Sequence, residues 1–191
     1  MTTEPARPTD RAAAVRRAMR SLVAEHGFHG ASMGAVAREA GVATGTAYTH
    51  YASKDDLVLA AYCETKAELS RDATSAIDPG GPPEQRFLTL WQAYYGYLRR
   101  NPEHARFLLQ VDHSPYRGPA HAAAMSDQTD PMLTQVMQAD LVALLLPLPV
   151  DVLYELALGP AVRLAASGEQ LTPRQLEDIA AGCWRAVTRP A

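Results

Sequence analysis

The sequence has few cysteines, no long apolar run and no secretory signal, and each absence excludes a class of protein. Its two cysteines, Cys63 and Cys183, are far apart, so we expect no disulfide scaffold and no CxxC metal site but small buried side chains in a reducing compartment. The longest apolar run, residues 141–149, has about half the length of a membrane helix and contains Pro147. The first ten residues lack the apolar centre of a signal peptide. We therefore expect a soluble cytoplasmic protein with no membrane segment.

Signatures of catalysis are also missing. The six histidines form no HxxxH or HExxH pattern, and the chain has no GxSxG nucleophile elbow and no glycine-rich phosphate loop. Asp112 and His113, together with His121, form the one arrangement that could hold a metal weakly. An enzyme or a metal sensor is therefore a minor alternative, and we expect neither a cofactor nor a metal.

What the sequence does contain is an uneven charge distribution. Residues 1–54 carry seven basic and four acidic side chains, a net charge of +3, whereas residues 55–191 carry eleven and seventeen, a net charge of −6. This positive field at one end favours contact with a polyanion there. Arg16, Arg17 and Arg20 lie within a turn of one another, a pattern typical of a solvated helix face that can also add long-range attraction.

Apolar residues recur at helical spacing, and no alternating strand pattern appears. We therefore expect an all-α fold of about nine helices. Asp10, Ser32, Thr44 and Ser53 occupy cap positions. After a flexible tail at residues 1–10, the expected helices lie at about 11–26, 32–40, 44–50, 54–77, 83–100, 102–112, 130–146, 150–167 and 173–188. We expect residues 114–128 to form a loop with at most one irregular turn.

The second and third of these helices meet the requirements of a helix-turn-helix. Such a motif needs a small residue where its helices pack closest, a glycine that adopts positive φ in the turn, and an apolar residue just after it. Ala37, Gly41 and Val42 supply these three at the required spacing. An ordinary helical hairpin has the same ingredients, so this motif alone leaves both interpretations open.

A longer stretch favours DNA binding. The run from Arg11 to Leu57, which includes GASMGAVAREAGVATGTAYTHYASKDDL, resembles the N-terminal DNA-binding domain of the TetR family of bacterial transcriptional regulators. The matching elements are Val36-Ala37, Gly41-Val42, Gly45-Thr46-x-Tyr48, an aromatic residue at 51 and Ser53-Lys54-x-x-Leu57. The resemblance implies a helix-turn-helix domain at 11–54 and an effector-binding and dimerisation domain at 55–191. It also implies a repressor that a small, mostly apolar ligand releases from a pseudo-palindromic operator.

The resemblance further implies which residues contact double-stranded DNA. The third helix enters the major groove, and Tyr48 grips the backbone through its hydroxyl. Lys54 and the start of the second helix dock phosphates. His50 fits a DNA contact and a neutral histidine bonded within its own domain equally well, and Tyr51 fits a core position better than a contact. The expected DNA-binding residues are Ser32, Met33, Thr44, Gly45, Thr46, Tyr48, Thr49, His50 and Lys54.

Three positions depart from common family members. Gly34 occupies a site where a polar or basic residue is frequent, which argues against a base contact from the second helix. Ala47 replaces a larger apolar residue, so the third helix packs more loosely or sits closer. Thr44 stands where lysine or arginine is frequent, which weakens any prediction of guanine readout.

Aromatic residues concentrate in the helix expected at 83–100, where Trp91 and Tyr95 share one face. Such a stripe is more often plain core, but the resemblance implies an effector pocket among the fourth to seventh helices. No cluster of Lys or Arg suggests a phosphate or coenzyme A ligand, so a mostly apolar ligand is expected. The expected lining is Tyr62, Lys66, Trp91, Tyr95, Phe107, Gln110, Met132, Val136 and Met137, with His113 and Tyr116 at the mouth.

The last two expected helices, at 150–167 and 173–188, are apolar on more faces than the outer surface of a monomer. The resemblance implies that they pair with their symmetry mates in a homodimer, which matches a twofold operator. The expected interface residues are Leu153, Leu156, Pro160, Ala161, Leu164, Leu176, Ile179, Cys183, Trp184 and Val187. The main alternative is a helical partner-binding protein that has kept the fold without reading DNA.

Overall fold

The computed structural model describes residues 8–189, and within them it contains helices and no strand beyond one isolated bridge, Leu145 with Thr188. The expected all-α fold is confirmed. None of the helices in this range is long and apolar enough to cross a membrane. Both cysteines are free thiols, Cys183 buried and Cys63 half-buried.

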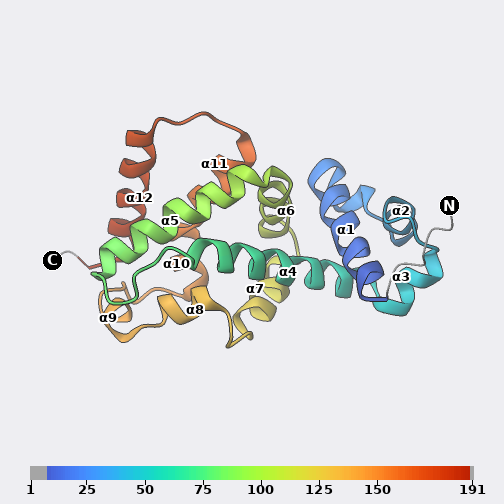
Figure 1. Cartoon of the computed structure of the whole chain (residues 1–191), viewed down its shortest axis with the longest axis horizontal. Coiled ribbons are helices and arrows are strands. Elements are labelled where there is room, and N and C mark those ends of the chain that lie inside the picture. Colours follow the sequence, from blue (N-terminus) through green and yellow to red (C-terminus); the bar gives the residue numbers. More distant parts are fainter. Residues whose placement is uncertain (1–7, 190–191) are drawn as a thin grey trace. The chain divides into compact units, whose positions relative to one another are not determined.

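Figure 1 shows the helices in chain order. The first four are α1 (Pro8–Gly30), α2 (Met33–Glu39), α3 (Thr44–His50) and α4 (Lys54–Thr74). They are followed by α5 (Pro83–Arg100), α6 (Pro102–Asp112), α7 (Arg117–Met125), α8 (Pro131–Val136), α9 (Ala139–Val142), α10 (Val150–Ala157), α11 (Gly159–Ser167) and α12 (Pro173–Val187).

The N-terminal helix starts earlier than the sequence predicts. Of the expected flexible tail, residues 1–7 lie outside the described residues, and residues 8–10 already belong to α1. Asp10 therefore lies in the first turn of α1 and does not cap it. Gly27, the predicted stop, has φ 66° and interrupts the helix there. Ala43 rather than Thr44 occupies the N-cap position of α3, and α4 ends at Thr74.

The predicted loop at 114–128 is wrong, because α7 forms within it. Its alanine-rich core, Ala120 to Ala124, favours helix, and the hydroxyl of Ser114 accepts a hydrogen bond from the Tyr116 N–H at 3.1 Å before the first turn. Two expected helices are each divided. Gln138 is extended between α8 and α9, and Pro160, which has no N–H, follows the break between α10 and α11.

Contacts between residues divide the chain into two compact units. The N-terminal unit comprises residues up to Thr65 together with Arg106–Ala124, and the C-terminal unit comprises Lys66–Ala105 together with residues from Met125 on. Helices α4 and α6 each contribute to both. The functional boundary at residue 54 is a different kind of division and stays a prediction.

The core of the N-terminal unit forms where α1, α2 and α3 meet. Val15, Met19 and Val36 are fully buried, as is Ala47, the unusually small residue of α3. Between α2 and α3, Gly41 has φ 67°, and the Val42 N–H donates to the Ala37 carbonyl at 2.9 Å. The three residues of the predicted turn therefore have the geometry that a helix-turn-helix requires.

In the C-terminal unit, α5 packs against α11 and α12 (Figure 1). The fully buried Trp91 donates from Nε1 to the Ala157 carbonyl at 3.0 Å, and the ring of Phe87 lies 5.4 Å from that of Trp184. Arg86 is buried and binds both carboxylate oxygens of Asp140, at 2.8 and 2.7 Å. The aromatic stripe of α5 is thus core in this structure.

Substitution of Gly41 tests the turn. In the left-handed region a side chain costs about 1–2 kcal/mol, so Gly41→Ala should lower the free energy of unfolding by that amount in urea denaturation. Gly34→Ala is the matched control because Gly34 lies exposed on a helix and has open space where a Cβ would lie; it should leave the stability unchanged or raise it. Equal effects of the two substitutions would contradict the positive φ at Gly41.

Candidate functional site

Helix α3 presents a polar surface of small side chains. Thr44, Gly45 and Thr49 are exposed, and Tyr48 exposes 51% of its surface, although its neighbour Ala47 is fully buried. The Thr49 hydroxyl donates to the Gly45 carbonyl at 2.9 Å. An aromatic residue this exposed on a short helix is unusual for a core residue and suits a contact with another molecule.

His50 and Thr46 differ from these residues in being half-buried. The His50 ring lies 6.4 Å from that of Tyr51 in a tilted arrangement. Tyr51 itself is 9% exposed, which agrees with a core position. Its hydroxyl accepts a hydrogen bond from Arg16 at 2.6 Å and donates to the Ala12 carbonyl at 3.3 Å. Tyr51 thereby ties the end of α3 to α1.

The helix starts near α3 have the caps that the sequence predicts. The Ser32 hydroxyl accepts from the Ala35 N–H at 3.2 Å, and the Ser53 hydroxyl accepts from the Asp56 N–H at 3.0 Å. Met33 is buried, so only its backbone can face a phosphate. The Lys54 ammonium donates to the Phe28 carbonyl. This bond uses one of its three donors and fixes the first turn of α4 to the end of α1.

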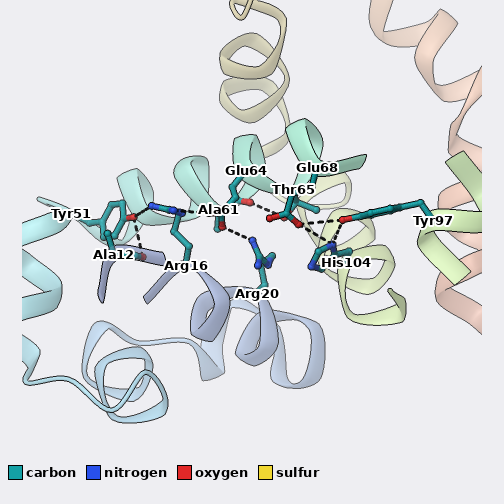
Figure 2. A network of polar contacts seen from close by, with 10 residues as sticks. All are labelled: Ala12, Arg16, Arg20, Tyr51, Ala61, Glu64, Thr65, Glu68, Tyr97 and His104. Carbon is teal, nitrogen blue, oxygen red and sulfur yellow. Dashed lines mark hydrogen bonds and ion pairs between the residues drawn. The ribbon is translucent and has the colours of Figure 1, made fainter. Parts of the chain in front are cut away.

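Two of the three α1 arginines turn inward. Arg16 and Arg20 both bind the carboxylate of Glu64 on α4, at 2.5 and 2.6 Å, and Figure 2 shows Arg16 between Tyr51 and Glu64. Arg20 is 4% exposed, whereas Arg17 is exposed. The expected solvated face is therefore wrong for Arg16 and Arg20, and only Arg17 is placed for long-range attraction.

This pair of ion pairs shifts the ionisation of all its members toward the charged form. Burial alone would raise the pKa of Glu64, but hydrogen bonds from Arg16 and Arg20, together with their charges, hold it below its ordinary value. The hydrogen bond to Glu64 raises the pKa of Arg16. The Nε atoms of both arginines are buried without a hydrogen-bond partner among the described residues. The terminal nitrogens alone therefore hold α1 to α4.

A second link reaches the first turn of α4. The Tyr116 hydroxyl, just before α7, donates to Asp55 Oδ1 at 2.7 Å, and the Tyr116 ring lies 4.8 Å from that of Phe28. Burial and the Asp55 carboxylate raise the pKa of Tyr116 to about 12. The hydroxyl therefore remains a donor at neutral pH. The sequence placed Tyr116 at a pocket mouth, and nothing in its spacing indicated Asp55 as a partner.

The predicted effector residues are distributed over both units, and whether they line one pocket stays a prediction. In the N-terminal unit, Tyr62 and Phe107 are buried, Tyr116 is half-buried, and Gln110 and His113 are exposed. In the C-terminal unit, Lys66, Trp91, Tyr95 and Met132 are buried, Val136 is half-buried and Met137 is exposed. The Trp91 and Tyr95 rings stack at 5.8 Å.

The predicted interface residues also differ in what they leave for a partner. Ala161, Cys183, Trp184 and Val187 are buried within the chain itself, and Leu156 is exposed. Half-buried members of the set are Leu153, Pro160, Leu164, Leu176 and Ile179. The side chains most exposed in this region lie on α10, where Val150 exposes 61% of its surface.

The weak metal arrangement does not assemble as a triad. His121 Nε2 lies 2.9 Å from Asp112 Oδ1, and its ring stacks on Tyr62 at 5.8 Å. His113 Nδ1 instead lies 2.9 Å from the Leu109 carbonyl. Asp112 and His121 thus act as a polar contact between α6 and α7.

Comparison with known proteins agrees with the geometry of both units. Residues 16–61 match the model of the bacterial regulatory proteins of the tetR family, and residues 82–188 match that of a tetracyclin repressor-like C-terminal domain. An HTH-type transcriptional regulator of Haemophilus influenzae is 28% identical over 189 residues, which cover 95% of this chain and 97% of the relative.

Solved structures agree as well. The crystal structure of a TetR-family transcriptional regulator from Haemophilus influenzae RD matches with a TM-score of 0.74 at 26% identity, and the match covers 95% of this chain and 98% of that one. One from Marinobacter aquaeolei VT8 has the same fold, with a TM-score of 0.73 at 22% identity over 95% of this chain and 97% of that one. These relatives are regulators and not enzymes.

Replacement of Glu64 tests the clamp between α1 and α4. Glu64→Gln leaves two arginines without their anion, so it should cost about 2–4 kcal/mol of unfolding free energy at pH 7. Because the folded pKa is lowered, the stability from Glu64 is present above its ordinary value of 4.5 and is lost as the pH falls through the folded value. Urea denaturation between pH 7 and 3 should therefore show less acid sensitivity in Glu64→Gln. The exposed Glu25→Gln should retain the wild-type profile, and equal profiles of all three proteins would contradict the clamp.

Two exposed helical glycines separate a structural from a DNA-facing role. Gly34 and Gly45 both have open space where a Cβ would lie, so Gly→Ala should stabilise each helix by about 0.5–1 kcal/mol. If α3 enters the groove, only Gly45→Ala should weaken DNA binding, because the added methyl group meets the nucleic acid. Thermal melting and fluorescence anisotropy with operator DNA measure the two effects. Loss of binding by Gly34→Ala instead would place the contact surface on α2.

Proposed function

We propose, from the premise that this chain belongs to the TetR family of bacterial transcriptional regulators, that it is a repressor which a small, mostly apolar ligand releases from a pseudo-palindromic operator. The observation that carries the DNA-binding part is the surface of α3. Its turn has the required geometry, its buried side supplies Ala47, and its outer side offers threonines and Tyr48 to a DNA groove.

The proposed phosphate contacts surround this surface. Tyr48 and Lys54 reach the backbone from α3 and α4, and Ser32, Met33 and Gly45 allow close approach of helix starts. Thr44, Thr46, Thr49 and His50 complete the proposed contact set. With Gly34 and Thr44 in place of larger polar or basic residues, much of the affinity comes from phosphates, so binding should depend steeply on salt.

The proposed switch acts through α4. This helix is continuous from Lys54, in the proposed DNA contact set, to Thr74 in the C-terminal unit. Glu64 holds its N-terminal half to α1, and Asp55 holds its first turn to Tyr116. A ligand that binds better when α4 is displaced shifts the population away from the spacing that fits the operator, and a ligand without that preference shifts nothing.

We further propose that two copies associate through α10, α11 and α12. Apolar side chains on α10, Val150, Val152 and Leu156, are exposed in the single chain, and covering them would remove apolar surface from water. The expected interface residues buried within the chain would support this surface from below. A twofold dimer presents two α3 helices to a twofold operator. Such a protein acts where the DNA lies, in the cytoplasm.

A DNA-binding assay decides between a regulator and a helical partner-binding protein. The full-length protein, mixed with labelled DNA from the promoter beside its own gene, should bind at low salt, with log affinity falling linearly with log salt concentration. Tyr48→Phe should weaken binding about three- to tenfold on every bound sequence, because it removes one phosphate hydrogen bond in each subunit. Exposed Gln92→Ala on α5 is the control. Absence of binding even at low salt would refute DNA readout, and loss at one sequence only would contradict a phosphate role for Tyr48.

A further inference from the structure

Lys66 is a buried lysine in a chain that otherwise uses arginine. Of its 18 basic residues only Lys54 and Lys66 are lysines, and Lys66 is 7% exposed on α4. Lysine is rarely buried this deeply without a carboxylate partner, because removing an ammonium from water costs free energy that an ion pair must offset. The surroundings of its ammonium therefore indicate what it is for.

Those surroundings are aromatic and incomplete. The ammonium lies 5.4 Å from the centre of the Tyr94 ring and 4.8 Å from that of Tyr154. Its one hydrogen bond within the described residues goes to the Tyr94 hydroxyl at 3.4 Å, longer than a usual hydrogen bond. The Tyr94 and Tyr154 hydroxyls lie 3.3 Å from each other. Three hydrogen-bonding groups thus converge at one point between α4, α5 and α10.

Other buried cations of the molecule are paired. Arg20 binds Glu64, and Arg86 binds both oxygens of Asp140. Among the ion pairs formed within residues 8–189, none includes Lys66. Cation–π contacts with two tyrosines offset part of the desolvation cost, but two of the three ammonium donors are left for an acceptor that this part of the chain does not supply.

We infer that Lys66, Tyr94 and Tyr154 bind a single carboxylate at one end of the effector. This inference rests on the proposed function and changes the expected ligand from a mostly apolar molecule to an apolar acid. An ammonium and two phenol hydroxyls can all donate to one carboxylate. A cationic ligand is excluded by repulsion from Lys66. A phosphate is a poor match, because the cation of this site is a single ammonium and not the arginine fork that suits a phosphate.

Helix α10 supplies the route by which a ligand reaches Lys66. None of the α10 side chains is buried, although Tyr154 from this helix lies over the ammonium. Pro149 precedes α10, and the chain breaks again at Leu158 and Gly159. A short helix with so little burial has little packing energy to lose. Displacement of α10 therefore exposes Lys66 at small cost, and the stacked Trp91 and Tyr95 lie on the same helix as Tyr94 to meet an apolar body.

Calorimetric titration of the full-length protein with matched acid and amide pairs tests the inference. The probes are octanoate, decanoate and phenylbutanoate, each compared with its own primary amide. Wild-type protein should bind at least one acid about tenfold or more tightly than its amide, as expected for a charge-assisted hydrogen bond. Lys66→Met should abolish that preference and Lys66→Arg should retain part of it. Arg71→Gln, on the exposed side of the same helix, should bind like wild type.

The ligand-free stability of Lys66→Met provides an independent readout. If Lys66 is kept for an acid, replacing its unpaired ammonium by an apolar side chain of similar length should leave the melting temperature equal or higher. A clear fall would show that Lys66 is structural and would overturn the inference. It would also be overturned by equal affinity of acids and amides, by an unchanged preference in Lys66→Met, or by absence of binding for every acid.

These outcomes are separate from the fate of the proposed function. Operator binding by the ligand-free wild-type protein tests whether the chain is a repressor, whatever the ligand. If the protein binds its operator and the amides release it as well as the acids do, the repressor stands and the carboxylate site falls. If it binds no DNA but Lys66 still confers a preference for acids, the reverse holds.

Discussion

The clamp that Arg16 and Arg20 form on Glu64 is the interaction on which the rest of the N-terminal unit depends. It crosses from α1 to α4, and through the hydrogen bond of Arg16 to Tyr51 it also reaches the end of α3. A charged group held this way is costly to break, because the arginine left behind is buried. The orientation of α3, the proposed recognition helix, is therefore linked to the position of α4.

The same helix carries two cations with opposite circumstances. Lys54 at its start is bonded to the Phe28 carbonyl and lies within reach of solvent, whereas Lys66, further along, is buried beside Tyr94 and Tyr154 with no anion from the described residues. Paired charges fix the DNA-binding end of α4, and an unpaired charge is left for a ligand at the other. This asymmetry gives one helix both a rigid attachment and a site at which a ligand gains binding energy.

Much of the fold followed from local sequence signals, and the errors came from side chains whose partners are distant in sequence. The capping serines, Gly27 and Gly41 act on their immediate neighbours, so their positions were predicted correctly. The run of arginines looked like a solvated face because helical spacing says nothing of Glu64, which lies 48 positions from Arg16. The helix α7 was missed because a proline and a glycine at its start outweighed the alanines that follow.

By itself the sequence determined the all-α class, the helix-turn-helix and the residues of α3 that face outward, because periodicity, caps and a positive-φ glycine are local properties. Only the tertiary structure decided which charges are paired. Whether Arg16 and Arg20 attract DNA or hold α4, and whether Lys66 is a pocket residue among others or a cation without an anion, depends on contacts between helices remote in the chain. Burial sets the free energy of a charge, and burial is a property of the fold.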